Sequence, residues 1–188
     1  MDEAPELLSR WRDGDAEAGD RLLRLCFASL HRFFTHKVEG GVDDLIQRTL
    51  LDCLEASPDL RDPGLFRAYL FRIARNRLFD RLRHERRLGP QVGLSELSLR
   101  DLGASPSSLL AEQQRARVLT EALRGLPLEA QIALELTYWE GMSAPQIASV
   151  LGINESTVRS RVTRARDALK RELREHAALG FADEPMLR

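Results

Sequence analysis

The sequence lacks several features that would place the protein in common classes. It has no apolar run approaching the roughly 20 residues that a membrane-spanning helix needs, and its N-terminus shows no signal-peptide pattern. We therefore expect a cytoplasmic protein with no membrane insertion. The chain also lacks a credible run of alternating apolar and polar residues, the pattern of a half-buried strand. This absence predicts an all-α fold.

Residues that carry catalytic or metal chemistry are scarce. The two cysteines, Cys26 and Cys53, lie within apolar helical patterns, which favours small buried thiols over a disulfide. The four histidines share no metal-ligand spacing with those cysteines. No nucleophile with a base, phosphate-binding loop or paired-carboxylate motif stands out. We therefore predict no enzymatic activity, no cofactor, no metal site and no small-molecule substrate.

The charges are segregated along the chain, although the formal net charge is only -1. Residues 1–66 hold eight basic and fourteen acidic residues, whereas residues 67–87 hold eight arginines and two acids. Seven more basic residues lie between Arg159 and Arg174. This asymmetry indicates two separate basic surfaces and an acidic N-terminal segment, residues 1–66, which we call the acidic front.

Helical periodicity dominates the sequence and divides it into two all-helical domains. Helices are predicted over residues 4–12, 16–38, 42–56, 64–87, 107–124, 127–140, 143–151 and 155–176. Two prolines and a glycine predict a loop over residues 57–64. The predicted organisation is a first domain over residues 1–87, a linker of little regular structure over 88–108, a second domain over 109–176 and a short tail over 177–188.

Residues 143–174 have the pattern of a helix-turn-helix. Ser143 is the predicted N-cap, Pro145 is tolerated in the first turn, and Gly152 followed by Ile153 and Asn154 supplies the turn and the next cap. On a helical wheel, one stripe of the second helix is apolar: Val158, Val162, Ala165, Leu169 and Leu173. The opposite side is basic and rich in hydroxyl groups: Ser156, Ser160, Thr163, Arg164 and Arg171. This geometry favours a recognition helix in a DNA major groove over an ordinary helical hairpin with a solvated basic face.

The helix predicted over residues 64–87 carries the other basic surface. Its apolar stripe consists of Phe66, Leu70, Ile73 and Ala74. The far side holds Arg72, Arg75, Arg83 and Arg86, with Phe79 among them. An aromatic ring among arginines is typical of surfaces that hold a nucleic acid backbone and stack bases. A merely solvated arginine-rich helix is the weaker interpretation, because few acids lie nearby to neutralise it.

Three sets of motifs together resemble the bacterial sigma factors of the extracytoplasmic function (ECF) type. Residues 43–49, DDLIQRT, resemble the acidic DLVQET helix of that family, and residues 66–76, FRAYLFRIARN, resemble its FxxWLYRIARN segment. Residues 126–127, 140–143, 147–148, 151–152 and 157–166 resemble its C-terminal helix-turn-helix. The chain departs from the family pattern at four positions: Arg48, Leu50, Tyr69 and Gln131.

The resemblance implies a sigma factor that binds core RNA polymerase and promoter DNA, recognises the -10 and -35 elements, and opens the promoter without ATP. It assigns polymerase binding to Asp43, Asp44, Ile46 and Gln47. It assigns -10 recognition and melting to Tyr69, Phe71, Arg72, Arg75, Asn76, Phe79, Arg83 and Arg86. It assigns -35 recognition to Ser156, Thr157, Arg159, Ser160, Thr163, Arg164 and Arg171. In this family the loop equivalent to residues 57–64 holds a flipped base, and an anti-sigma factor is an expected partner.

Two other classes of protein share part of this pattern. A conventional regulator that binds duplex DNA has a similar helix-turn-helix, but its front half would carry a receiver or ligand-binding domain rather than an arginine-rich helical surface. A polymerase-binding antagonist without promoter function would not need the second basic surface. The combination of both surfaces favours the sigma factor.

Overall fold

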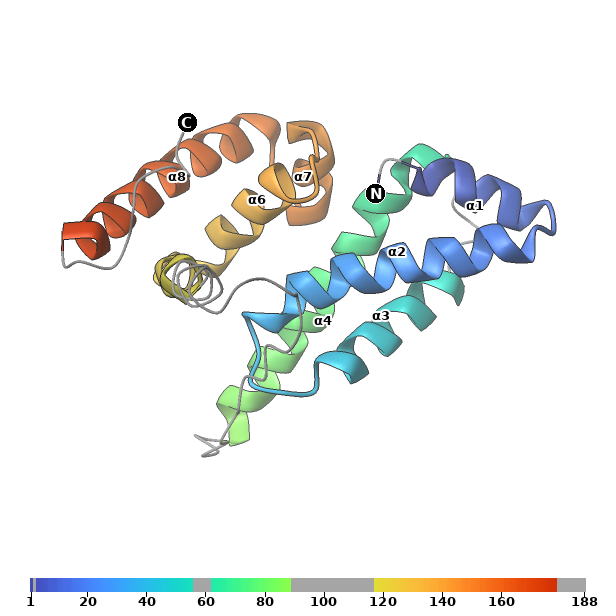
Figure 1. Cartoon of the computed structure of the whole chain (residues 1–188), viewed down its shortest axis with the longest axis horizontal. Helices are drawn as coiled ribbons and strands as arrows, with labels where there is room; N and C mark the ends of the chain where they lie inside the picture. Colours follow the sequence, from blue (N-terminus) through green and yellow to red (C-terminus); the bar gives the residue numbers. More distant parts are fainter. Residues whose placement is uncertain (2, 56–61, 89–116, 179–188) are drawn as a thin grey trace, which may run out of the picture.

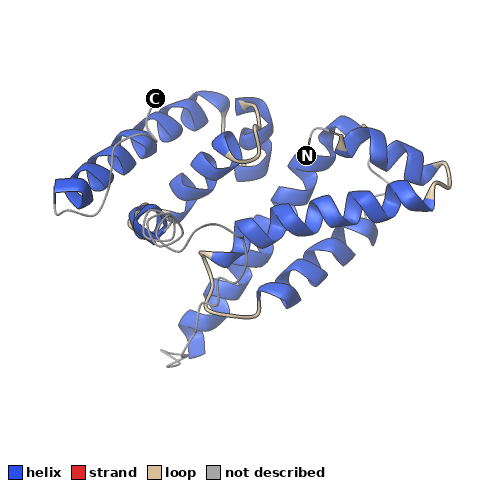
Figure 2. Cartoon of the chain, in the orientation of Figure 1, coloured by secondary structure: helices blue, strands red, loops and turns tan. Residues whose placement is uncertain are grey.

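The computed structural model describes residues 1, 3–55, 62–88 and 117–178, and the regular secondary structure within these ranges is entirely helical (Figures 1 and 2). The main helices are α1 (Ala4–Arg12), α2 (Ala16–Thr35), α3 (Val42–Glu55), α4 (Phe66–Leu88), α6 (Leu128–Tyr138), α7 (Ala144–Leu151) and α8 (Glu155–Ala178). A short 3-10 helix, η2 (Pro63–Leu65), precedes α4, and residues 117–124 are also helical. The predicted all-α class is confirmed. None of the described helices is long and apolar enough to cross a membrane.

The predicted helices agree with the structure except near some ends. The helix predicted over residues 16–38 ends at Thr35, a few residues before Gly40 and Gly41, whose φ angles of 87° and 70° few other residues adopt. The helix predicted over 127–140 spans Leu128–Tyr138, because the chain turns at Gly141 with a φ of 61°. The predicted linker after Leu88, most of the predicted loop, residues 107–116 of the helix predicted over 107–124, and the predicted tail after Ala178 lie outside the described residues.

Helices α1 to α4 pack together around one apolar core. The carboxylate of Asp15 accepts a hydrogen bond of 3.0 Å from the backbone N–H of Ala18 and starts α2. The ring of Phe71 on α4 packs at a centroid distance of 5.6 Å from that of Phe33 on α2. Each side-chain oxygen of Asp52 on α3 accepts a 2.7 Å hydrogen bond from Arg77 on α4. This arrangement holds α4 firmly against the helices on either side of it.

Helices α6, α7 and α8 form a second group, shown in yellow to red in Figure 1. Leu134 of α6 and Ala165 of α8 are buried in a small apolar cluster with residues of the segment that precedes α6. Helix α7 contacts both α8 and α4, so the second group rests on the first (Figure 1). As a result, the main apolar core is continuous from α1 to the start of α8.

Candidate nucleic-acid and polymerase interfaces

Local hydrogen bonds define the turn of the helix-turn-helix. The backbone N–H of Ser143 donates to the side chain of Gln146 at 2.9 Å, at the start of α7. Gly152 ends α7 in the left-handed region, with a φ of 67°. The side chain of Asn154 then accepts a hydrogen bond of 2.9 Å from the backbone N–H of Thr157. The predicted start, turn and second cap therefore all occur where the sequence indicated.

Helix α8 has the two faces that the sequence predicted. Val158 and Ala165 are buried, and Val162, Leu169 and Leu173 are half-buried. The candidate DNA contacts on the other side are exposed: Ser156, Arg159, Ser160, Thr163, Arg164 and Arg171. Thr157 differs, because it is half-buried and its hydroxyl donates to Asn154 at 2.6 Å. Its position fits a helix cap better than contact with a base.

The exposed arginines near the start of α8 lie along its surface. Arg159 pairs with Glu155 one turn earlier at 2.8 Å, and Arg164 donates to the backbone oxygen of Ser160 at 3.2 Å. Such exposed pairs contribute little to stability, so these side chains can exchange them for contacts with DNA at small cost. Arg161 is instead half-buried and binds Glu129 of α6 at 2.6 Å.

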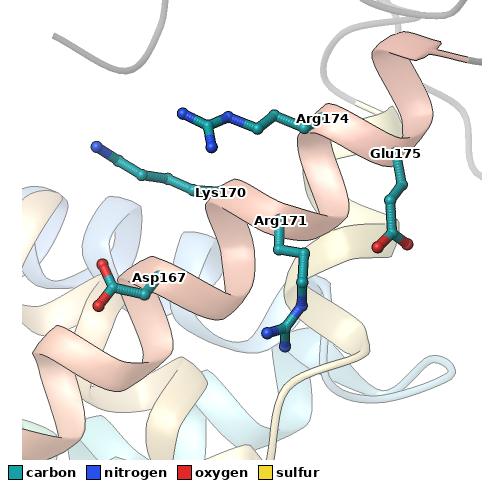
Figure 3. A pocket seen from close by; sticks show the side chains of 5 residues that line it. All are labelled: Asp167, Lys170, Arg171, Arg174 and Glu175. Atoms are coloured by element: carbon teal, nitrogen blue, oxygen red, sulfur yellow. The ribbon is translucent and has the colours of Figure 1, made fainter.

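Further along α8, the side chains of Asp167, Lys170, Arg171, Arg174 and Glu175 border a shallow hollow of about 520 Å³ (Figure 3). Figure 3 shows Lys170 and Arg174 extending to one side of the helix while Arg171 points to another. The basic character of α8 therefore continues two turns beyond Arg164.

Two arginines on α4 lie over aromatic rings of the same helix. The Arg72 guanidinium lies 5.2 Å from the ring centre of Tyr69, and that of Arg75 lies 4.9 Å from the ring centre of Phe79. Arg72, Asn76, Arg83 and Arg86 are exposed, whereas Tyr69, Arg75 and Phe79 are half-buried. Arg83 forms an ion pair with Asp80. The structure therefore brings seven of the eight candidate residues to the accessible part of α4.

Phe71 is the exception, and its predicted role in DNA binding is wrong for this conformation. Its side chain is fully buried against Phe33 in the first helix group. The motif places Phe71 one position before Arg72, but the helical rotation between them turns Phe71 into the core. Phe71 can position α4, but it does not reach DNA from this site.

The acidic surface of α3 needs a similar correction. Asp43, Asp44 and Gln47 are exposed, but Ile46 is fully buried and belongs to the core. Sequence reasoning missed Leu51, whose side chain is 58% exposed. Helical spacing puts Leu51 one turn beyond Gln47, so the wheel of this helix could have identified it. Polymerase-binding candidates on α3 therefore become Asp43, Asp44, Gln47 and Leu51.

Arg48 and Gln131, which depart from the family pattern, each form a side-chain contact within their own helix. Arg48 binds Asp44 at 2.9 Å, so one candidate carboxylate already has a cation beside it. Gln131 is buried and donates to Glu135 at 3.0 Å. Where an arginine is common in the family, this chain therefore has a neutral hydrogen-bond donor.

The cysteines have the inert character that their apolar surroundings predicted. Cys26 and Cys53 are both free and buried, and burial raises the pKa of each thiol to about 12. Within the described ranges, no group of three or more His, Cys, Asp or Glu side chains is placed to hold a metal ion.

Each of the two helix groups matches the model of a known protein family. The sigma-70 region 2 model matches residues 20–88, and the sigma-70, region 4 model matches residues 116–169. The ECF RNA polymerase sigma factor SigM of Mycobacterium tuberculosis is 32% identical over 171 residues, covering 89% of this chain and 83% of that protein. The "Probable RNA polymerase sigma factor RfaY" of Xanthomonas campestris is 31% identical over 134 residues, or 70% of this chain, which spans only 34% of that longer protein.

Two solved structures share the arrangement of helices. CnrH, in complex with the cytosolic domain of CnrY, has a TM-score of 0.63 and 29% identity, covering 92% of this chain and 97% of that chain. The sigma factor RpoE of Bartonella quintana, in complex with the anti-sigma factor NepR, has a TM-score of 0.67 and covers 82% of this chain and 96% of that chain. At 23% identity this second likeness shows the fold alone.

The matched regions define a sigma factor, a regulator of promoter-specific transcription rather than an enzyme. The chain belongs to the ECF RNA polymerase sigma factors.

Proposed function

We propose that this chain binds core RNA polymerase in the cytoplasm, recognises the -10 and -35 elements of promoters, and opens the DNA without ATP. The observation that carries the proposal is the pair of basic helix surfaces on α4 and α8, each backed by an apolar core. One surface carries aromatic rings suited to unpaired bases, and the other belongs to a helix-turn-helix suited to duplex DNA.

The proposed -35 contacts lie near the start of α8. Ser160, Thr163 and Arg164 are exposed there, opposite buried Val158 and Ala165. In helix-turn-helix proteins the N-terminal part of the second helix reaches base edges in the major groove. Arginine can bind guanine there through two hydrogen bonds, which is the commonest specific contact.

The proposed -10 contacts lie on α4. Tyr69 and Phe79 would stack on bases of the opened strand, and Arg72, Arg75, Arg83 and Arg86 would hold its backbone. Unstacking a base costs a few kcal/mol, and each base that stacks on an aromatic side chain recovers about 1 to 3 kcal/mol. The two terms are similar in size, so binding energy can drive opening without ATP hydrolysis.

The proposed polymerase contact is the exposed face of α3, with Asp43, Asp44, Gln47 and Leu51. An apolar side chain within an acidic rim is suited to a basic and partly apolar partner. We also propose an anti-sigma partner, because the RpoE structure contains one. An inhibitor can bind the same exposed apolar side chain of α3 that would contact polymerase.

A selection experiment tests this function. Random DNA fragments are incubated with core RNA polymerase and the chain, and the bound fragments are sequenced. We expect the selected fragments to share two separated sequence blocks, one for each proposed promoter element. A single duplex block, selected equally well without polymerase, would instead identify a conventional regulator.

A further inference from the structure

A buried ion pair joins the two helix groups. Lys37, just after α2, binds Glu135 of α6, and their side chains are 0% and 3% exposed. Lys37 also donates to the backbone oxygen of Phe33 and lies 4.4 Å from the centre of that ring. Burial lowers the pKa of Lys37 and raises the pKa of Glu135. Each charge is therefore acceptable in the interior only while the other is present.

Glu140 provides a second connection between the groups. Its carboxylate accepts hydrogen bonds from Arg32 at 2.6 Å and from Ser29 at 3.2 Å, both on α2. Its backbone oxygen accepts a hydrogen bond from the buried Arg67 side chain of α4. The turn after α6 is thus tied to two helices of the first group.

Glu129 provides a third connection, between an arginine of the basic surface of α4 and a half-buried arginine of α8. One of its oxygens binds Arg75 of α4 at 3.3 Å, and the other binds Arg161 of α8 at 2.6 Å. A carboxylate between two guanidinium groups has the charge and the acceptor geometry of a DNA phosphate. Within the described chain, the Nε of Arg75 is buried without a hydrogen-bond acceptor, so Glu129 satisfies this arginine only in part.

We propose that Glu129, Glu135 and Glu140 hold the free chain in a closed conformation in which Glu129 occupies the place of a DNA phosphate. This inference rests on the proposed function of the two basic surfaces. Core polymerase would bind the exposed face of α3, separate the groups and release Arg75 for the promoter. A buried ion pair is suited to such a device, because the cost of removing its charges from water offsets much of their attraction. The closed and open conformations can then interconvert.

Small-angle scattering on the full chain, without DNA or polymerase, measures closure directly. The double variant Glu129→Gln with Glu140→Gln should have a larger radius of gyration, because each substitution keeps the size of the side chain and removes its charge. Glu3→Gln combined with Asp20→Asn is the matched control, since it also removes two acids and breaks only exposed contacts with Arg21 and Arg24 of α2. Circular dichroism should show equal helix content in all three proteins. An unchanged radius in the double variant would overturn the proposal.

Binding to a non-specific DNA duplex provides the second measurement. If the open form is about one tenth of the free chain, opening it fully raises the apparent affinity about tenfold. The control should change affinity only by the loss of two acidic charges, with the radius unchanged. A double variant that expands without gaining affinity beyond the control would show that Glu129 does not compete with phosphate. Neither result depends on promoter-specific transcription, so failure of the proposed function is detected separately by the selection with polymerase.

Discussion

The backbone N–H of Thr157 donates a 2.9 Å hydrogen bond to the side chain of Asn154 and so starts the helix that carries the proposed -35 contacts. Replacing Asn154 with Ala should destabilise this end of α8 by about 1 kcal/mol, because a helix N-cap contributes that much. Hydrogen exchange of the first-turn amides of α8 measures the change. Asn154→Asp is the control, since Asp also caps helices. Equal exchange in the Ala and Asp variants would show that the cap does not stabilise the helix.

Arg164 and Arg171 should have different roles on the same face of α8. Arg164→Ala should cost about 1 to 3 kcal/mol and relax preference at one base pair, since arginine near the helix start can bind a guanine edge. Arg171→Ala should weaken all sequences alike and lower the salt slope by about one phosphate. Promoter libraries assayed at two salt concentrations measure both effects. A uniform loss of activity in Arg164→Ala, with base preference unchanged, would make that residue a backbone contact.

Tyr69 and Asn76 should act after polymerase has bound. Replacing either with Ala should leave the closed promoter complex nearly intact and slow opening, because these side chains would contact only unpaired bases. Permanganate footprinting detects the unpaired thymines. If both variants open the promoter at the parental rate, α4 does not act in promoter melting.

Phe71 is the matched contrast to Tyr69 on the same helix. Because its ring is fully buried, Phe71→Ala should cost about 3 to 5 kcal/mol of folding stability. That loss should appear in thermal unfolding of the chain alone, whereas Tyr69→Ala should change stability much less.

Leu51 and Ile46 allow a similar comparison on α3. Leu51→Asp should weaken binding to core polymerase while leaving stability within about 0.5 kcal/mol, because the side chain is exposed. Ile46→Ala should cost about 2 to 5 kcal/mol of stability, because Ile46 is in the core. Polymerase pull-down and thermal unfolding separate the two effects. If Leu51→Asp binds polymerase as well as the parental chain, this face of α3 does not contact polymerase.

Periodicity and capping were enough to predict most helices, both faces of α8 and the burial of the cysteines. These features depend on residues close in sequence, such as Asn154 with Thr157. The errors at Phe71 and Ile46 arose where a family motif was assigned as a whole, although the 3.6-residue period of a helix turns some residues of such a motif into the core. The pairs Lys37–Glu135 and Arg75–Glu129 join residues far apart in the chain. Nothing in local periodicity identifies such partners, so only the structure could show them.

Transcription from a promoter obtained in the selection tests the central claim most directly. Core RNA polymerase is supplied with nucleotides, with ATP replaced by an analogue that can be incorporated but whose β–γ bond cannot be hydrolysed. With the chain added, we expect a run-off transcript from one defined start site; with core enzyme alone, we expect none. The acidic front should keep the chain from binding the promoter tightly by itself. Tight, specific binding by the chain alone, with no stimulation of core polymerase, would contradict the account.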